Sequence, residues 1–181
     1  MKFYKEVVLK NGMKCVLRNP GSRDGEEILR HMIQTSEETE NMARYADEFT
    51  MTAEEENKYL RELEENPRAV MISAYIEDKL AANGGLNPVS LRERCKHRAE
   101  FGISVKKDYW GIGIGSAVME AIIESARKAN YEQIELEVVD HNKRGIGLYN
   151  KFGFEIYGKR DNSFKYRDGR TAGEYLMFLH L

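Results

Sequence analysis

One stretch, residues 101–129, constrains the fold more than any other, because it combines a strand, a glycine-rich turn and a helix. Phe101, Ile103 and Val105 alternate with other residues as in a half-buried strand. The turn reads Tyr-Trp-Gly-Ile-Gly-Ile-Gly-Ser over residues 109–116. Beyond it, small and apolar residues recur at helical spacing and predict an amphipathic helix. They are Ala117, Val118, Ala121, Ile122, Ser125, Ala126 and Ala129.

The three alternate glycines of this turn, Gly111, Gly113 and Gly115, predict an anion-binding site. The first amide groups of a helix have no partner inside the helix and carry partial positive charge. Glycines let a ligand approach those amides with no side chain between. Such a turn suits a pyrophosphate. The alternative interpretation is a tight turn whose glycines have positive φ and bind nothing.

Composition excludes several other classes of protein. A length of 181 residues suits one domain, and 41% hydrophobic with 32% charged residues is typical of a globular protein. No uncharged stretch reaches the roughly 18 residues of a membrane helix, and no signal peptide is apparent, so we expect a cytoplasmic protein. The net charge of −2 argues against general nucleic-acid binding. Cys15 and Cys95 stand alone, so neither a disulfide framework nor a metal site is expected.

The rest of the chain predicts a single mixed α/β domain over residues 1–181, with no repeat or linker. Asn11-Gly12 favours a type I′ hairpin turn. Asp24 is expected to cap a first helix, and Thr52 with Glu55 forms a capping box for a second. Strands are expected at 69–76, 80–86, 98–105, 134–138, 154–159 and 173–180, and a short helix at 143–151.

Residues 100–154 resemble the acetyl-CoA-binding core of the GNAT superfamily of N-acetyltransferases. That family's turn is Gln or Arg, two residues, Gly, any residue, then Gly or Ala. Gly113 and Gly115 match this pattern, whereas Trp110 occupies the Gln/Arg position. A second match lies downstream, at about the same distance from the turn as in the family. This second match comprises Leu136-Glu137-Val138, Asn142 and the run Leu-Tyr-Asn-Lys-Phe-Gly-Phe at 148–154. Together, the two matches place the cofactor-binding core at about residues 98–154.

The resemblance implies a mixed, mostly antiparallel central sheet flanked by helices, in which two parallel central strands splay apart. Acetyl-CoA, the co-substrate, would lie between those strands. Its pantetheine arm would run along Ile103, Ser104 and Val105 and contact Asn142. Its pyrophosphate would be held by Gly111, Ile112, Gly113, Ile114, Gly115 and Ser116.

The resemblance also places Tyr149 beside the thioester sulfur, which makes it our candidate general acid. A tyrosine hydroxyl, with a reference pKa of about 10, can donate a proton or a hydrogen bond to a thiolate whose acid has a pKa near 8.5. The attacking amine must itself lose a proton, and Glu137 is the candidate base, with Glu100 as the alternative. Neither cysteine has an evident base partner, so we expect direct transfer within a ternary complex.

The predicted function is therefore transfer of the acetyl group from acetyl-CoA to a primary amine. The sequence leaves the acceptor open among small-molecule amines, polyamines and protein amines. It also leaves the oligomeric state open, with a homodimer as one option. A non-catalytic acyl-CoA sensor with the same fold is the alternative. A Rossmann-type oxidoreductase is disfavoured, because the glycines run G-x-G-x-G rather than G-x-G-x-x-G.

Charge is distributed unevenly along the chain. Residues 36–65 contain eleven acidic and three basic residues, whereas residues 141–170 contain eight Lys or Arg and three acidic residues. In the resembled family the early helices border the acceptor entrance and the later segment helps hold the phosphate-rich cofactor. An acidic rim would favour a cationic acceptor. An ordinary solvated helical face is the alternative.

Overall fold

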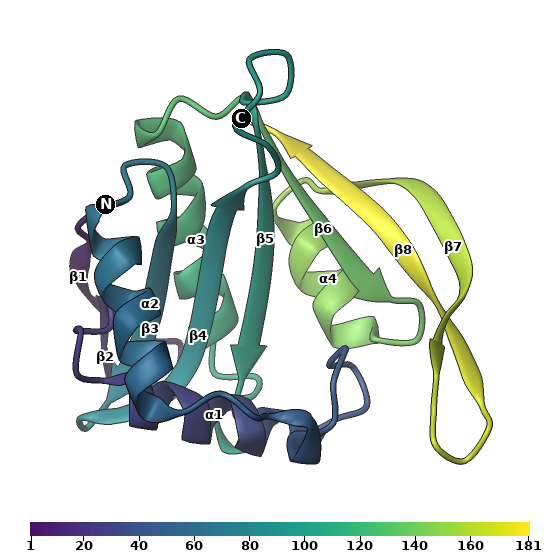
Figure 1. The fold of residues 1–181 in the computed structure, drawn as a ribbon, viewed down its shortest axis with the longest axis horizontal. Coiled ribbons are helices and arrows are strands. Elements are labelled where there is room, and N and C mark those ends of the chain that lie inside the picture. Colours follow the sequence, from purple (N-terminus) through teal and green to yellow (C-terminus); the bar gives the residue numbers. More distant parts are fainter.

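The computed structural model describes residues 1–181 as one eight-stranded sheet with helices on both faces (Figure 1). The strand order is β1-β2-β3-β4-β5-β6-β8-β7. The strands are β1 Tyr4–Val8, β2 Lys14–Arg18, β3 Val70–Ile76, β4 Lys79–Pro88, β5 Arg98–Val105, β6 Gln133–Val139, β7 Glu155–Lys165 and β8 Thr171–His180. The helices are α1 Gly25–Glu38, α2 Ala53–Glu65, α3 Ile114–Lys128 and α4 Lys143–Lys151, with short 3-10 helices η1 Ala46–Glu48 and η2 Lys107–Tyr109.

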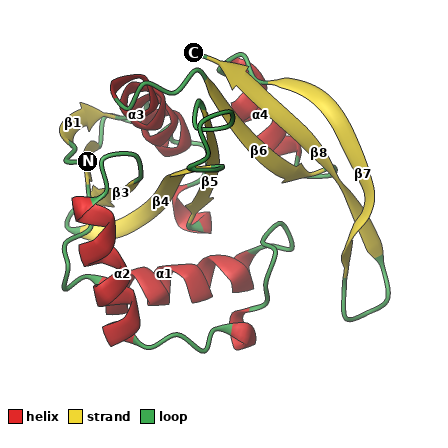
Figure 2. Ribbon diagram, turned by 45° about the horizontal axis from the view of Figure 1, so that its top comes forward, coloured by secondary structure: helices red, strands yellow, loops and turns green.

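The four α-helices divide between the two faces of the sheet. Figures 1 and 2 show α1 and α2 over one face and α3 and α4 over the other. On the first face, α1 contacts β4 and β5; on the second, α3 contacts β2, β3, β4 and β5. None of these helices has both the length and the apolar character required to cross a membrane.

The two central strands separate from one another. β5 and β6 are the only parallel neighbours, and they pair only from Arg98↔Gln133 to Glu100↔Glu135. Beyond Glu100, residues 101–105 of β5 pair with β4 alone. The other edge of this stretch therefore has no strand partner. The mixed, mostly antiparallel sheet with splayed parallel central strands is confirmed.

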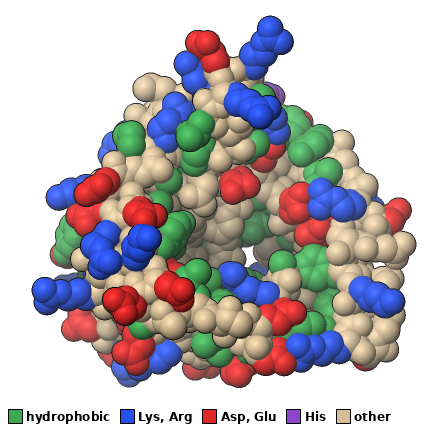
Figure 3. Space-filling model, viewed as in Figure 1, with side chains coloured by type: hydrophobic (Ala, Val, Ile, Leu, Met, Phe, Trp, Pro, Cys, Tyr) green, Lys and Arg blue, Asp and Glu red, His purple; other side chains and the backbone are tan.

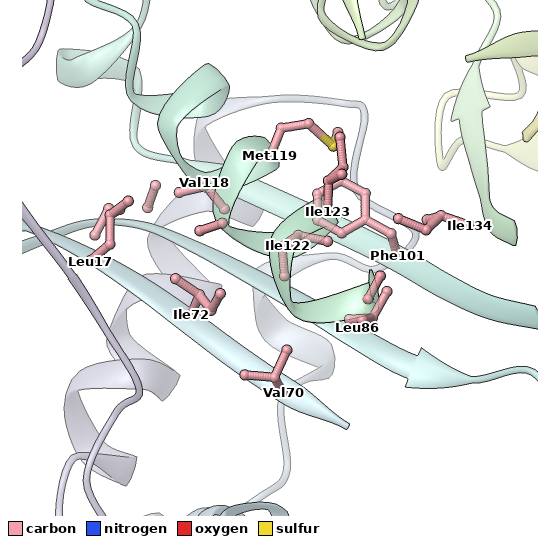
Figure 4. Packing of buried hydrophobic residues seen from close by; sticks show 14 of the residues in the cluster. Leu17, Val70, Ile72, Leu86, Phe101, Val118, Met119, Ile122, Ile123 and Ile134 are labelled. Carbon is pink, nitrogen blue, oxygen red and sulfur yellow. The ribbon is translucent and has the colours of Figure 1, made fainter. Parts of the chain in front are cut away.

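The main core lies between α3 and the sheet (Figure 4). Val118 and Ile122 of α3 are fully buried and belong to the same cluster as Leu17, Ile72 and Leu86. Burying such a side chain stabilises the fold by about 1.5–3 kcal/mol. The apolar face predicted for residues 117–129 thus packs on the sheet.

Most predicted elements are confirmed, including the capping box at Thr52 and Glu55. The type I′ turn at Asn11-Gly12 is wrong, because only Gly12 has positive φ. The loop is longer: Gly12 N donates to Leu9 O, and Leu9 N donates to Met13 O. Asp24 occupies the N-cap position of α1, but its carboxylate accepts from Gly21 N and Arg18 instead of from the helix. The β7–β8 hairpin is longer than predicted, because shifts in register let β7 continue to Lys165.

Candidate active site

Two hollows of different chemistry adjoin in this fold. The first, here the glycine cleft, has a volume of about 280 Å³ and is lined by the glycine turn, β5 and the start of α4. The second, here the acidic cavity, has a volume of about 1070 Å³ and lies between the end of α1, η1 and the β7–β8 hairpin. Thr39 and Met42 line both. Figure 3 shows the face that carries α1 and α2, hollowed near its centre and bordered by acidic and basic side chains.

The glycine turn leaves its backbone open to the cleft. Gly111 and Gly113 have φ of 81° and 100°, and Gly113 is the N-cap of α3 without a side-chain cap. A Cβ at Gly111 would meet no atom within 4 Å. A Cβ at Gly115 would instead lie 3.2 Å from Leu148. Gly115 therefore serves close packing between α3 and α4, whereas Gly111 and Gly113 serve the conformation of the turn.

Trp110, the departure from the family's pattern, ties the turn to the neighbouring strand. Its indole Nε1 donates to Val105 O at 2.7 Å. The guanidinium of Arg144, on α4, stacks over the indole at 4.2 Å. In this chain the Trp110 ring therefore holds the guanidinium of Arg144 at the cleft. In the family's pattern, a Gln or Arg of the turn itself occupies the position of Trp110.

The glycine cleft is electropositive. Lys10 and Arg144 are among its lining residues, and none of those residues is an Asp or Glu. The free amides at the start of α3 add partial positive charge. Lys151 lies beside this end of the helix, with its Nζ donating to Ser116 Oγ at 2.9 Å. The cleft therefore suits a ligand that carries phosphate.

Tyr149 lines the glycine cleft from α4 and is almost completely buried. Its ring packs edge-on against Phe101, with centroids 6.5 Å apart, and against Phe154 at 5.8 Å. Burial raises the pKa of Tyr149 to about 12. The hydroxyl therefore remains protonated throughout the neutral pH range and can act as a hydrogen-bond donor.

The acidic cavity is lined by eight carboxylates and four cationic side chains. Several of them pair across it. Arg167 contacts Asp47 at 2.8 Å, and Arg170 contacts Glu40 at 2.6 Å. These ion pairs connect the β7–β8 hairpin to the segment that follows α1. The basic end of the chain thus contacts the acidic early segment, and of its cationic residues only Arg144 lines the glycine cleft.

Glu137 lines the acidic cavity and not the glycine cleft. Its carboxylate accepts two hydrogen bonds from Arg160, at 2.9 and 3.1 Å, and its side chain is half exposed. Glu100, the alternative base, is exposed on β5 and lines neither hollow. Of the two carboxylates, only Glu137 therefore faces one of these two hollows.

His31, on α1, is a buried residue that the sequence analysis did not single out. It is fully buried, and its Nε2 lies 2.8 Å from Ser104 Oγ. Its Nδ1 has no hydrogen-bond partner. Burial, together with the nearby charge of Lys106, lowers the pKa of His31 to about 4. The imidazole is therefore neutral at neutral pH.

The lowered pKa of His31 predicts a loss of stability in mild acid. The unfolded chain, with a histidine pKa of about 6.5, takes up a proton before the folded chain does as the pH falls. The stabilising contribution is complete above about pH 6.5 and is lost progressively toward pH 4. We expect the wild type to lose about 2–3 kcal/mol more unfolding free energy than His31→Gln between pH 7 and pH 4.5, as measured by urea denaturation. Equal losses in the two proteins would contradict this assignment.

Most of the predicted site residues come together in the glycine cleft. Ile112 does not line it, because its side chain packs against the core, and Glu137 faces the other hollow. Asn142 is the N-cap of α4, where its Oδ1 accepts from Gly145 N at 3.0 Å. The remaining predicted residues line the cleft: Ile103, Ser104, Val105, Gly111, Gly113, Ile114, Gly115, Ser116, Asn142 and Tyr149. Lining residues from distant segments, such as Lys10 and Thr35, carried no local sequence signal.

Known proteins share both the sequence pattern and the architecture of this chain. Residues 29–154 match the acetyltransferase (GNAT) family. The chain is 28% identical over 165 residues to the L-amino acid N-acetyltransferase AaaT of Escherichia coli strain K12, covering 91% of this chain and 96% of that protein. It is 31% identical over 97 residues to the ribosomal protein bS18 alanine N-acetyltransferase of the same strain, covering 53% of this chain and 66% of that protein.

Two solved structures have the same fold. A GNAT-family acetyltransferase from Streptococcus pneumoniae matches with a TM-score of 0.88 and 25% identity, over 92% of this chain and 99% of that one. YncA of Salmonella typhimurium, solved with its cofactor acetyl-CoA, matches with a TM-score of 0.81 and 14% identity, over 92% of this chain and 94% of that one.

Proposed function

Because the chain belongs to the acetyltransferase (GNAT) family and is an acetyl-CoA-dependent N-acetyltransferase, we propose that acetyl-CoA occupies the glycine cleft and that the acceptor amine enters through the acidic cavity. The observation that carries this proposal is the contrast in charge between two adjoining hollows. One has cationic lining residues and no carboxylate, and the other has twice as many carboxylates as cations. We further propose that residues 1–181 act as one acetyltransferase domain, because a single sheet spans Tyr4 to His180.

The cleft has the features that acetyl-CoA requires. The open backbone at Gly111 and the uncapped start of α3 would hold the pyrophosphate, with Lys10 and Arg144 adding positive charge. The edge of residues 101–105 that has no strand partner would hydrogen-bond the amides of the pantetheine arm as an added strand does, although Val105 O already accepts from Trp110 Nε1. Bound there, acetyl-CoA supplies the activated acetyl thioester.

Tyr149 would donate a hydrogen bond to the leaving sulfur. Burial raises its pKa to about 12, above the reference value of about 8.5 for a thiol, so the tyrosine is the weaker acid and complete proton transfer is unfavourable. A hydrogen bond that stabilises the developing thiolate is therefore the role we assign to it. Cys15 is fully buried, Cys95 lines neither hollow, and burial raises the pKa of Cys15 to about 11. These properties favour direct transfer to the amine over an acyl-cysteine intermediate.

Glu137 is the proposed base for the attacking amine, acting from the acidic cavity directly or through water. We expect Glu137→Gln to lower kcat/KM by about 10²-fold at neutral pH, because a positioned base typically contributes that much. The loss should shrink as the pH rises toward the pKa of the amine, where more of the acceptor is already neutral. Steady-state rates from pH 6.5 to 9.5 measure this.

Glu174→Gln is the matched control for this experiment. Glu174 also pairs with Arg160, at 3.3 Å, and also lines the acidic cavity. It should show little pH-dependent loss. A defect of Glu137→Gln that is the same at every pH would show that Glu137 positions Arg160 or the acceptor and does not remove a proton.

The excess of carboxylates in the acidic cavity favours a cationic acceptor. We expect kcat/KM for a polyamine or a basic peptide to exceed that for neutral amines at low ionic strength. Raising the salt concentration should reduce this preference by about tenfold, because ions screen the attraction. Equal kcat/KM values for cationic and neutral amines in low salt would contradict the proposal.

An L-amino acid is a second candidate acceptor. It is favoured by the similarity to AaaT and by two cavity cations, Arg44 and Lys165, that form no ion pair. Such a cation could receive an α-carboxylate. Comparing L-lysine with 1,5-diaminopentane separates the candidates, since the two differ by that carboxylate. A higher kcat/KM for the diamine supports the polyamine-type acceptor, and a higher value for lysine supports the amino acid.

Release of free thiol from acetyl-CoA in the presence of an amine panel tests the proposed function as a whole. Turnover with at least one primary amine is expected. Tight binding of acetyl-CoA without turnover on any amine would instead support the acyl-CoA sensor.

A further inference from the structure

A buried histidine reaches the glycine cleft through a single side chain, Ser104. His31 lies on α1 and Ser104 on β5, 73 residues apart in the sequence, and their Nε2 and Oγ atoms are 2.8 Å apart. His31 is fully buried, whereas Ser104 is partly exposed and lines the cleft. The pair therefore connects the interior of the helix–sheet layer with the ligand-binding surface.

The surroundings of the imidazole determine which ring nitrogen carries the proton. Nδ1 is buried without a partner. A buried N–H without an acceptor costs about 1–3 kcal/mol, and orphaned donors are rarer in proteins than under-satisfied acceptors. The proton of the neutral ring therefore belongs on Nε2, which donates to Ser104 Oγ.

This tautomer leaves the hydroxyl hydrogen of Ser104 available to a ligand. A serine hydroxyl has one donor hydrogen and two acceptor lone pairs, and His31 occupies a lone pair. Ser104 Oγ makes no other hydrogen bond in the protein, and no carboxylate lines the cleft to receive that hydrogen. By contrast, the hydroxyl of neighbouring Thr35 already donates to His31 O at 2.9 Å.

Ser104 also lies in the part of β5 that has separated from β6. On the proposed function, this stretch contacts the acyl-bearing arm of acetyl-CoA, which is rich in carbonyl oxygens. We propose that Ser104, oriented by His31, donates a hydrogen bond to a carbonyl oxygen of the bound acetyl-CoA arm. Ser104 is then a ligand-contacting residue and His31 its positioning residue. No covalent bond changes at either side chain.

The test compares Ser104→Ala, His31→Leu, the double variant and His31→Gln, whose amide can still donate. Ser73→Ala is the matched control, because Ser73 is a buried strand serine whose hydroxyl bonds Asn83 and which does not line the cleft. Calorimetry measures the Kd for CoA, and steady-state kinetics give kcat and KM for acetyl-CoA. CoA carries the amide carbonyls of the arm but lacks the thioester carbonyl, so the two measurements distinguish the acceptor oxygens.

We expect Ser104→Ala to cause a loss of about tenfold, the effect of one hydrogen bond. The loss appears in the Kd for CoA if the partner is an amide carbonyl, and in kcat with an unchanged Kd if it is the thioester carbonyl. His31→Leu should reproduce the defect, the double variant should be no worse than either single variant, and His31→Gln should retain most of the function.

The proposal is overturned if Ser104→Ala matches Ser73→Ala in both measurements, or if the Ser104 and His31 defects multiply in the double variant. If His31→Leu does not fold, Ser104→Ala still tests the ligand contact, and a folded His31→Gln that shows the full Ser104→Ala defect would contradict the positioning role. A wild-type protein that binds no CoA would contradict the proposed function. A wild-type protein that binds CoA, together with an unaffected Ser104→Ala variant, would contradict only the role of Ser104.

Discussion

Replacing Tyr149 with phenylalanine is expected to lower kcat by about 10²–10³-fold and to leave acetyl-CoA binding nearly unchanged. This is the usual effect of removing one preorganised donor from a site of developing charge. The phenyl ring keeps the packing against Phe101 and Phe154, so only the hydroxyl is lost. Single-turnover rates with a saturating amine measure the chemical step, and calorimetry measures binding of CoA.

Tyr131→Phe is the matched control for Tyr149→Phe. Tyr131 is also buried, and its hydroxyl donates to Arg68 O at 2.6 Å, away from both hollows. Its loss should reduce stability and leave the rate unchanged. A Tyr149→Phe enzyme whose single-turnover rate equals that of the wild type would remove this tyrosine from the proposed mechanism.

Replacing Gly113 with valine is expected to weaken acetyl-CoA binding by about 10²-fold or more. The side chain would stand where the pyrophosphate approaches the amides of α3, and losing two charge-assisted hydrogen bonds has this effect. It would also lie 3.3 Å from Lys10 Cγ and displace that cleft residue. Lys10→Ala, measured in parallel, separates the contribution of the lysine from that of the amides.

The control must carry the same backbone strain, because valine at positive φ is unfavourable anywhere. Gly169→Val meets this requirement: Gly169 has a φ of 90°, open space around it and a position in the β7–β8 turn. Both variants should lose stability, but only Gly113→Val should lose affinity for CoA. Wild-type affinity in a folded Gly113→Val protein would place the pyrophosphate elsewhere.

The two predicted catalytic residues, Tyr149 and Glu137, line different hollows. Tyr149, which the resemblance to the family pointed out, lines the glycine cleft together with the turn. Glu137 lies on β6, the strand next to β5 in the sheet, yet it faces the acidic cavity and pairs with Arg160 from β7. The sequence cannot reveal that partner, because β7 reaches its neighbours by pairing with β8, which in turn pairs with β6.

The sequence shows that residues 36–65 are acidic and residues 141–170 are basic, but it does not show that the two segments contact each other. The two segments were expected to border different ligands. In the fold they also face each other, and Asp47 and Glu40 pair with Arg167 and Arg170. Exposed ion pairs of this kind contribute little to stability, typically about 0–1 kcal/mol. Their importance lies in shaping the acidic cavity.

The sequence by itself determined the elements whose signals are local. A strand, a glycine turn and an amphipathic helix within residues 101–129 define the glycine cleft's main wall, because periodicity and the conformational freedom of glycine act over a few residues. The tertiary structure alone decided which distant side chains meet there. Lys10 and Arg144 became cleft residues, and His31 reached Ser104 across 73 residues, because strand pairing and helix packing bring together positions that no local pattern relates.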